Sequence, residues 1–447
     1  MRVLHTGDWH VGRSLRGRDR TAEIGRALDE ILSIVRSEGV HLILVAGDVF
    51  DSPNPSAEAE AVVYDFFRRT GELGVPSVII AGNHDSAARL DGISGLLKSV
   101  NAHATGRVRA AKEGGVLHLQ AGGAPVAVAA LPFLSERRLV KAAQLLTADV
   151  ASWRQTYQQG MAFFTDLLSK SFDASSVNLF MLHATLEGAK PSGSEHQFYL
   201  TNAYTIDPAS LPAGAQYIAV GHLHRNQQLR DIPPVHYSGS IVQLDFGEAG
   251  ESKVVKLVEV TPRKPAVVHD LPLTLETPLR VVRTSLGGLD RALESERAFP
   301  GYLKVVVRLD IPQPFLKDRV MQQYPNVIAF DPEMTKATVE LSERVDADVR
   351  PLEAFISYYR ERRNATPEPA VIAAFRELYR ETRGEELPDS DPPPVPPEVS
   401  TVETRPRRNG RARLKKTSAG DGLGLDTPGE GLPDAAEDGL EEVDVSF

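Results

Sequence analysis

Short apolar runs, each followed by a polar side chain, are the main pattern in the first half of the chain. Runs of four or five aliphatic residues bounded by glycine are typical of buried β-strands. If the strands lie side by side, their ends meet, so we expect the polar side chains to converge. The runs and the residues that follow them are Val3-Leu4 before Asp8-Trp9-His10, Leu42 to Ala46 before Gly47-Asp48, Val78 to Ala81 before Gly82-Asn83-His84-Asp85, Leu179 to Leu182 before His183, and Tyr217 to Val220 before Gly221-His222-Leu223-His224.

Segments with helical periodicity alternate with these runs. Apolar residues recur at the spacing of an amphipathic helix in about 21–39, 56–74, 90–100 and 149–171. Alternating strands and helices indicate a layered α/β domain. We assign residues 1–265 to it, because Lys253 to Val260 is the last strand of this region and the run Thr261-Pro262-Arg263-Lys264-Pro265 marks a junction.

Three smaller regions follow this domain. Residues 275–345 have a β-α-β-α-β pattern without a catalytic motif, and residues 350–384 form two amphipathic helices with stripes such as Leu352, Phe355, Ile356 and Tyr359. Two helices of this kind need a docking surface, either on a partner or on their own domain. Residues 386–447 are rich in proline, then basic, then acidic, a composition that predicts a disordered tail.

Composition and charge narrow the class of protein. The chain has 447 residues, no cysteine and a formal net charge of −10. The lack of cysteine excludes thiolate metal sites and fits a reducing compartment, and we expect no membrane span or signal peptide. The tail, residues 386–447, holds 14 acidic and 7 basic side chains, so the rest of the chain is nearly neutral. No basic track for nucleic acid is visible in the linear sequence.

The convergent side chains have the chemistry of a two-metal site. Carboxylate, amide and imidazole groups bind hard and borderline divalent cations, and the ligands alone admit manganese, iron or zinc. Seven side chains suffice if Asp48 bridges both metals. Asp8, His10 and His224 then complete one metal, and Asn83, His183 and His222 complete the other. Two such metals form a clamp for displacement at phosphorus.

Two further residues are candidates for catalysis rather than for metal binding. His84 follows a ligand, and its ring is expected to face the leaving group as a proton donor. Asp51 lies three residues after Asp48, and its carboxylate is expected to orient the His84 ring.

The motifs around the predicted ligands resemble those of the calcineurin-like metallophosphoesterase superfamily and, within it, of the SbcD family of nuclease subunits. These motifs are His5-Thr6-Gly7-Asp8-Trp9-His10, Gly47-Asp48-Val49-Phe50-Asp51, Gly82-Asn83-His84-Asp85 and Gly221-His222-Leu223-His224. The later run Leu244-Asp245-Phe246-Gly247-Glu248 is similar to that family's closing signature. Archaeal and eukaryotic counterparts usually carry His at the position of Asp51, so the chain sides with the bacterial branch.

The resemblance implies a fold, an activity and partners. It implies a metallophosphoesterase β-sandwich flanked by helices (α/β, α+β layered), with a small β-α-β-α-β capping domain that contacts DNA, and C-terminal helices. It implies a Mn²⁺-dependent exonuclease and endonuclease for double-strand DNA and hairpins in DNA repair, recombination and replication. It also implies a homodimer, an SbcC-like coiled-coil ATPase bound by the C-terminal helices, and a cytoplasmic, nucleoid-associated location.

Two other functions remain open from the residues alone. One is a phosphodiesterase or phosphatase for small nucleotides or phosphoproteins, although such a substrate needs neither a capping domain nor paired C-terminal helices. The other is a non-catalytic scaffold that has lost its metals, which the intact set of ligands argues against.

Overall fold

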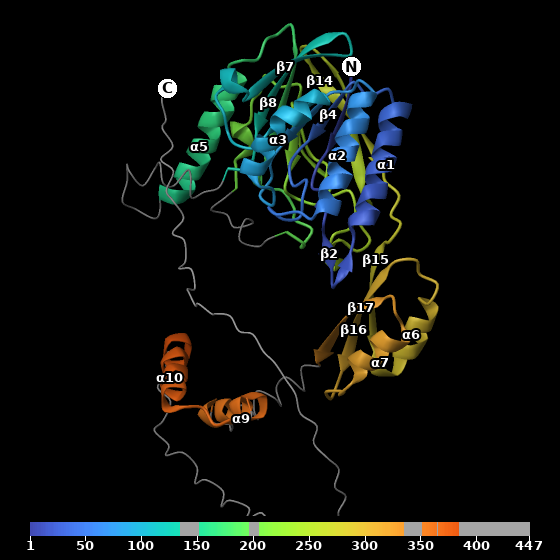
Figure 1. Ribbon diagram of the computed structural model, residues 1–447, viewed down its shortest axis with the longest axis vertical. Helices are drawn as coiled ribbons and strands as arrows, with labels where there is room; N and C mark the ends of the chain where they lie inside the picture. The colour runs from blue at the N-terminus through green and yellow to red at the C-terminus, as the bar shows by residue number, and fades with distance from the viewer. Residues whose placement is uncertain (135–151, 196–204, 335–350, 364, 384–447) are drawn as a thin grey trace, which may run out of the picture. The chain divides into compact units, whose positions relative to one another are not determined.

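The computed structural model describes residues 1–134, 152–195, 205–334, 351–363 and 365–383 (Figure 1). The chain divides into two units, Met1–Arg350 and Pro351–Phe447, which are considered separately. No helix in the described ranges is long and apolar enough to cross a membrane.

One six-stranded sheet forms the first half of a sandwich. β1 pairs in parallel with β4 and antiparallel with β13, and the parallel order continues from β4 to β5 and β6. In sheet order the strands are β14 (Lys264–Pro272), β13 (Val254–Thr261), β1 (Arg2–Thr6), β4 (Leu42–Val45), β5 (Ser77–Ile80) and β6 (Ala102–Thr105).

A second six-stranded sheet packs against the first. A core of small and branched side chains fills the space between the sheets, and Leu44, Met181 and Ala219 in this core are fully buried. In sheet order the strands are β11 (Gln227–Asp231), β12 (Pro234–Tyr237), β10 (Tyr217–Gly221), β9 (Val177–His183), β8 (Ala124–Leu131) and β7 (Val116–Ala121). The predicted sandwich is confirmed.

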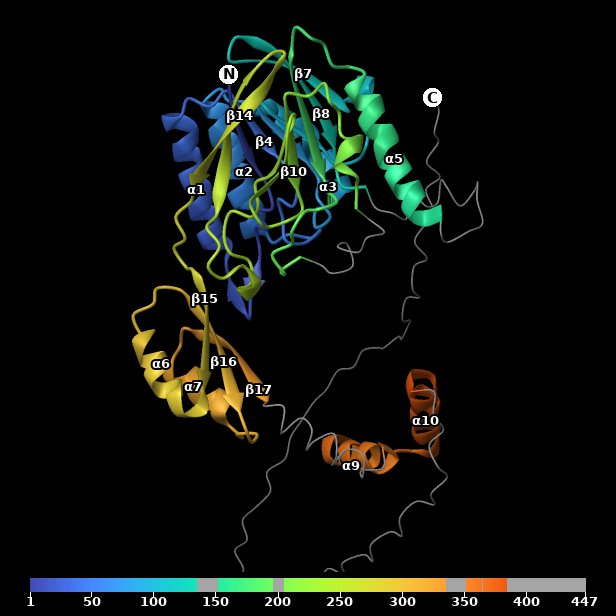
Figure 2. The same ribbon diagram turned by 180° about the vertical axis from the view of Figure 1, so that it is seen from behind.

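Helices cover the outer faces of the sandwich, as Figures 1 and 2 show. On the first sheet lie α1 (Thr21–Ser37), α2 (Ala57–Glu72) and α3 (Ala87–Ser99), and on the second lies α5 (Ser152–Ser169). The amphipathic pattern explains this placement, because the apolar stripe of each helix faces a sheet. Ser56 caps α2, its side chain accepting the backbone N–H of Ala59. Short 3₁₀ turns also belong to this unit: η1 (Ala111–Glu113), η3 (Pro208–Ser210), η4 (Phe246–Glu248) and η5 (Leu286–Gly288).

The predicted junction at Thr261-Pro262-Arg263-Lys264-Pro265 is wrong. This segment is the turn of a hairpin, and Arg263 has a positive φ of 65° there. β14 returns along β13 as the edge strand of the first sheet. Proline and a left-handed residue mark tight turns as well as domain boundaries, so this sequence pattern alone does not distinguish the two. The first domain therefore continues to the end of β14.

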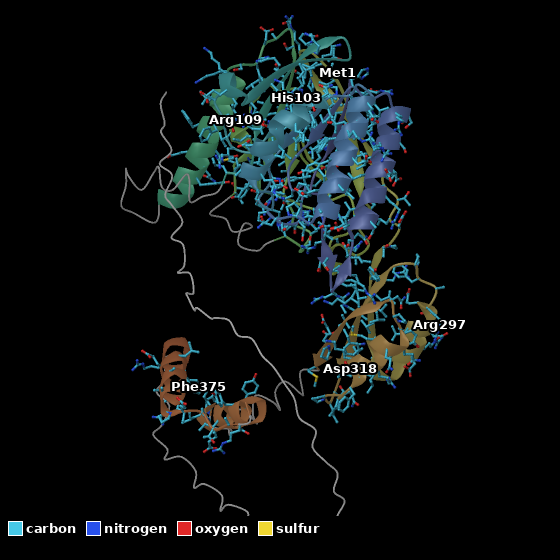
Figure 3. The ribbon with its side chains drawn as sticks, in the orientation of Figure 1. Met1, His103, Arg109, Arg297, Asp318 and Phe375 are labelled. Carbon is cyan, nitrogen blue, oxygen red and sulfur yellow. The ribbon has the colours of Figure 1, made fainter. Side chains whose placement is uncertain are left out.

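A separate three-stranded parallel sheet follows, in the order β15-β16-β17. Its elements are β15 (Leu279–Ser285), α6 (Leu289–Ser295), β16 (Tyr302–Leu309), α7 (Leu316–Gln323) and β17 (Val327–Met334). Arg297 and Asp318, labelled in Figure 3, belong to this part of the chain. The predicted β-α-β-α-β order is confirmed up to β17; the further strand expected near Ala337–Leu341 lies outside the described residues.

The second unit contains α9 (Pro351–Arg363) and α10 (Pro369–Arg383), the two helices expected there. The ring of Phe355 stacks on that of Phe375 with 4.2 Å between centroids. Phe375 is labelled in Figure 3. Large apolar side chains nevertheless stay on the surface, since Tyr358 is 59% and Leu378 58% exposed. The predicted disordered tail lies outside the described residues.

Candidate metal centre

The predicted ligands gather at the end of the sandwich where the central strands finish. Met1 marks the opposite end, from which β1 starts (Figure 3). Parallel strands finish at one edge of a sheet, so the loops after them meet. Asp8 and His10 follow β1, Asp48 follows β4, Asn83 and His84 follow β5, His183 ends β9, and His222 and His224 follow β10.

The first two ligand loops continue the pairing of their strands. The backbone N–H of Asp8 donates to Gly47 O at 2.9 Å, and that of His10 donates to Asp48 O at 3.0 Å. The two loops are therefore held in register with each other. Four of the predicted ligands have left-handed backbone, with φ of 49° at Asp8, 49° at His10, 47° at Asp48 and 103° at His222. Such conformations are unfavourable for residues with a Cβ and concentrate at functional sites.

Two glycines allow the loops to approach this closely. A Cβ on Gly82 would lie 2.1 Å from Asp48 Oδ1, and a Cβ on Gly221 would lie 1.9 Å from the carbonyl oxygen of Ala46. Any side chain at either position would push the ligand loops apart. Glycine before Asn83 and before His222 is therefore a packing requirement of the site.

His183 faces acceptors with both of its nitrogens. Nδ1 donates to the carbonyl oxygen of Ala46 at 2.8 Å, because a carbonyl can only accept. In the neutral ring Nε2 then carries a lone pair, and it points at Asn83 Oδ1 at 3.0 Å and at Asp48 Oδ2 at 3.3 Å. Three electron-rich atoms facing one another require a proton or a cation between them.

His10 presents a second nitrogen of this kind. Its Nδ1 donates to the Asp51 carboxylate at 3.1 Å, which leaves the lone pair on Nε2. That Nε2 is buried, has no hydrogen-bond partner among the described residues, and lies 3.6 Å from Asp48 Oδ2. Asp48, His183 and His222 present ligand atoms close enough to share one ion, as do His10, Asp48 and His84. These residues fit divalent cations, with Asp48 common to both groups.

Charges and burial act against one another in this cluster. Burial and the nearby Asp48 raise the pKa of Asp8 to about 7. Burial lowers the pKa of His10 to about 4 and, together with His183, that of His222 to about 3. Burial opposes protonation of His183 too, but the Asp48 and Asp8 carboxylates raise its pKa to about 9. Without a metal ion, a proton on His183 supplies the positive charge between these groups. A bound cation would supply that charge in its place.

His224 is held by a buried carboxylate that sequence reasoning missed. Its Nδ1 lies 3.1 Å from Glu248 Oε1, so Nδ1 donates and Nε2 keeps the lone pair. Glu248 is fully buried and also accepts from Lys253, itself 1% exposed, at 2.5 Å. His224 and Lys253 hold the pKa of Glu248 well below its usual range, against the effect of burial. Glu248 belongs to the run Leu244 to Glu248 that resembles the family's closing signature. Its contact with His224 joins residues 24 positions apart, so nothing in the neighbouring sequence predicts this contact.

The structure gives Asp51 a different task from the one expected for its side chain. His84 Nδ1 donates at 2.9 Å to the backbone carbonyl of Asp51, so the main chain orients the ring. The carboxylate of Asp51 accepts from His10 and, at 3.1 Å, from Arg13. The expectation that this carboxylate orients His84 is therefore corrected. The backbone carbonyl can orient the His84 ring in place of a carboxylate, because orienting the ring takes one hydrogen-bond acceptor and does not require a negative charge.

Phe133 is another neighbour of the site that the sequence did not reveal. Its ring centroid lies 6.1 Å from that of His183 and 6.4 Å from that of His222, and its backbone N–H donates to Ala81 O at 2.9 Å. Phe133 follows β8, on the second sheet. An aromatic face beside the imidazoles limits the rotation of both rings.

The fold and the site agree with a comparison against protein families. The calcineurin-like phosphoesterase model matches residues 1–226, which carry Asp8, Asp48, Asn83, His222 and the rest of the proposed ligands. The chain belongs to the calcineurin-like phosphoesterase family. Members of this family use divalent metal ions, and Asp48, His183 and His222 form a possible metal site in this chain.

Curated relatives narrow the assignment to the SbcD group of that family. The chain is 35% identical to the SbcD component of nuclease SbcCD from Bacillus subtilis over 62% of this chain and 71% of that protein. It is 31% identical to the Escherichia coli K12 protein of the same name over 66% and 74%, and 31% identical to that of Rhodobacter capsulatus over 70% and 81%. Among solved structures, a dimetal phosphatase from Danio rerio aligns with a TM-score of 0.37 and 14% identity, over 61% of this chain and 98% of that one.

Proposed function

We propose that the chain is the nuclease subunit of an SbcCD-type complex and hydrolyses phosphodiester bonds of DNA at two divalent cations. The observation that carries the proposal is the buried position of His183 Nε2, which lies 3.0 Å from Asn83 Oδ1 and 3.3 Å from Asp48 Oδ2. The proposed metal ligands are Asp8, His10, Asp48, Asn83, His183, His222 and His224. Mn²⁺ is the cation that the family resemblance implies.

The protein residues around the cations have separate tasks in this proposal. When bound, the cations supply an activated water and neutralise charge on the phosphate oxygens. Asp48 would contribute to holding both cations, because it belongs to both groups of possible ligands. Ala46, Asp51 and Glu248 each accept from the Nδ1 of a ligand histidine, which turns the Nε2 lone pair toward the cation.

His84 is the proposed proton donor. Its Nδ1 donates to the Asp51 carbonyl, so protonated Nε2 is the remaining N–H that can reach substrate. Its ring centroid is 4.7 Å from that of the proposed ligand His10, which supports a proton donor beside the proposed cations. A proton from Nε2 would go to the sugar oxygen that leaves phosphorus.

The proposed partners follow from the remaining parts of the chain. Exposed Tyr358 and Leu378 on α9 and α10 suit a docking surface on an SbcC-like coiled-coil ATPase. The three-stranded unit after Leu279 is the proposed capping domain for DNA. On α3, Leu97 is buried but Leu96 is 73% exposed, which suits a homodimer contact. With DNA as the substrate, we propose a cytoplasmic protein associated with the nucleoid.

Hydrolysis assays with two substrates test this function. Purified full-length protein is incubated with Mn²⁺ and either a labelled DNA hairpin or bis(4-nitrophenyl) phosphate, with and without a partner ATPase. We expect cleavage of both substrates. Cleavage of the ester but never of DNA would instead support a small-molecule phosphodiesterase. An absence of hydrolysis with every divalent metal would support a scaffold.

A further inference from the structure

A short hairpin leaves the first ligand loop directly after His10. β2 (Ser14–Leu15) and β3 (Arg18–Asp19) pair antiparallel, with Leu15 opposite Arg18. The two turn residues, Arg16 and Gly17, both have positive φ, of 50° and 79°. Left-handed backbone at both positions is the type I′ geometry that matches the twist of paired strands. Figure 1 shows this hairpin, labelled β2, projecting from the sandwich.

The base of the hairpin is fixed to the metal site. The backbone N–H of Arg13 donates to His10 O at 3.0 Å, and the N–H of Arg20 donates to Arg13 O at 2.9 Å. The guanidinium of Arg13 also contacts the Asp51 carboxylate that holds His10. The hairpin therefore begins one hydrogen bond from a metal ligand.

Its outer side is fixed to the three-stranded unit. Leu15 is 3% exposed and belongs to an apolar cluster with Phe246 and Leu279. Arg20 is 2% exposed, and it donates to Glu23 at 2.8 Å and to the Gln243 carbonyl at 3.0 Å. Both ends of the hairpin are thus held by buried contacts, so the position of its tip relative to the cations is set by the fold.

The tip carries positive charge that the protein does not neutralise locally. Arg16 and Arg18 are both exposed, and none of the ion pairs in the described part of the chain involves either residue. Arg13 and Arg20 differ from them because Asp51 and Glu23 pair with their guanidinium groups. Asp19, the acidic residue of the hairpin, is engaged by the N–H and hydroxyl of Thr21 at 2.9 and 2.7 Å.

We propose that the β2–β3 hairpin binds the phosphate backbone of a nucleic-acid strand whose scissile bond lies at the cations, through Arg16 and Arg18. The inference rests on the proposed function, because it needs a polymeric substrate. Each DNA strand carries a phosphate about every 3.4 Å along the helix axis, so a strand running from the cations past a fixed projection presents further phosphates to it. A small diester carries a single phosphate, which the cations would occupy, so it offers no further phosphate to the tip. The hairpin therefore favours polynucleotides over small esters.

The positive charge of Arg16 and Arg18 also favours a nucleic-acid strand over an apolar partner at the hairpin. Guanidinium groups on an exposed turn bind phosphate oxygens in pairs of hydrogen bonds and offer little to an apolar surface. The acidic stretch of the same chain, residues 419–447 with nine acidic and no basic side chains, is a competing occupant of the same charge. The two are distinguished by adding the corresponding synthetic peptide to the DNA-binding assay.

The test uses the full-length chain and charge-removing variants. Arg16→Gln, Arg18→Gln and the double variant are compared with wild type, and Arg36→Gln is the matched control, since Arg36 is exposed at the far end of α1. DNA affinity is measured by fluorescence anisotropy in EDTA between 50 and 200 mM salt, so that neither metal nor turnover enters. A second assay measures kcat/KM for DNA divided by kcat/KM for bis(4-nitrophenyl) phosphate.

We expect the double variant to bind DNA at least about fivefold more weakly at low salt and to lose about 0.9 in the log–log salt slope for each phosphate contact removed. The ratio of kcat/KM values should fall by a similar factor, and Arg→Lys variants should restore most of the affinity. Affinity and slope equal to those of Arg36→Gln would overturn the proposal. So would an equal loss on both substrates, or tight binding of the acidic peptide with no effect of the variants on DNA. If wild type cleaves no DNA but binds it through the hairpin, the proposed function fails and the hairpin contact survives.

Discussion

The backbone N–H of His84 donates to Asp48 Oδ1 at 2.8 Å. The carboxylate proposed to join the two cations therefore also positions the loop of the proposed proton donor. The other carboxylate oxygen, Oδ2, lies 3.3 Å from His183 Nε2. The proposed metal binding and the proposed proton donation thus share one aspartate, but they assign different side chains to the two tasks, so mutation should separate them.

Replacing the His84 side chain should abolish turnover without emptying the site. The N–H of His84 that contacts Asp48 belongs to the backbone and survives in His84→Ala. We expect kcat to fall by about 10²–10⁴ with Mn²⁺ content unchanged, because a proton donor is lost and the proposed ligands remain. Metal content is measured by mass spectrometry beside the hydrolysis rate. Asp48→Asn is the comparison that should lose metal, and loss of metal in His84→Ala would refute the separate roles.

Removing the charge behind His224 should weaken metal binding. Glu248 accepts from His224 Nδ1, and a glutamine there no longer fixes which nitrogen carries the lone pair. We expect Glu248→Gln to lower Mn²⁺ affinity by about 10- to 100-fold in calorimetric titrations. The exposed Glu259, which pairs with Arg2 on the surface, supplies the control Glu259→Gln. Equal affinities in the two variants would show that Glu248 has no role in positioning.

A methyl group at Gly221 should disrupt the site, and one at Gly92 should be tolerated. The Cβ of Gly221→Ala would meet the Ala46 carbonyl at 1.9 Å, whereas a Cβ on Gly92, within α3, has no atom within 4 Å. We expect Gly221→Ala to lose activity and at least about 2 kcal/mol of unfolding free energy. Gly92→Ala should gain about 0.5–1 kcal/mol from helix propensity. Urea denaturation followed by circular dichroism checks both, and similar midpoints would contradict the close packing of the loops.

Acid should destabilise the sandwich through His236, a buried histidine of β12 that is not among the proposed ligands. Burial, reinforced by Lys256, lowers the pKa of His236 to about 4, whereas the unfolded imidazole titrates near about 6.5. Between these values the unfolded chain binds more protons. The free energy of unfolding is therefore full above about pH 6.5 and falls as pH drops to about 4, by on the order of 3 kcal/mol.

The pH effect is measured as a difference between two proteins. Urea unfolding of wild type and His236→Gln is followed from pH 4 to pH 7, so that contributions from other groups cancel. The variant should lose less stability than wild type over this interval. Parallel curves would mean that His236 is not the group responsible.

The sequence predicted the fold where one local pattern, an apolar run followed by polar side chains, indicated both a buried strand and a candidate site residue. Runs such as Leu42 to Ala46 predicted buried strands. The Asp, Asn and His residues after them converge because parallel strands end at the same edge of a sheet. The recognition of the family, the sandwich and the nuclease class are confirmed by the family model and the curated relatives. The division of the rest of the chain at 275–345 and 350–384, the metal-binding roles and the role of His84 as proton donor remain predictions.

The features that sequence reasoning missed depend on contacts between distant residues. Nothing near Glu248 indicates that it meets His224, and nothing near Asp51 tells carbonyl from carboxylate as the partner of His84. The sequence alone does not single out the arginines of the β2–β3 hairpin, because they are few in number. Their proposed role depends on the position of the hairpin beside the ligand loop. The misplaced junction at Thr261–Pro265 shows the reverse error, since turn residues alone do not distinguish a hairpin from a domain boundary.

The division of the proposed ligands between two sheets has a consequence for how the enzyme matures. Four ligands follow strands of the first sheet and three come from the second, while β13, the neighbour of β1, is made after all of them. A ribosome must therefore have passed residue 261 before the cation pocket can close. Metal binding by the full set of proposed ligands would therefore be a late event for each new molecule.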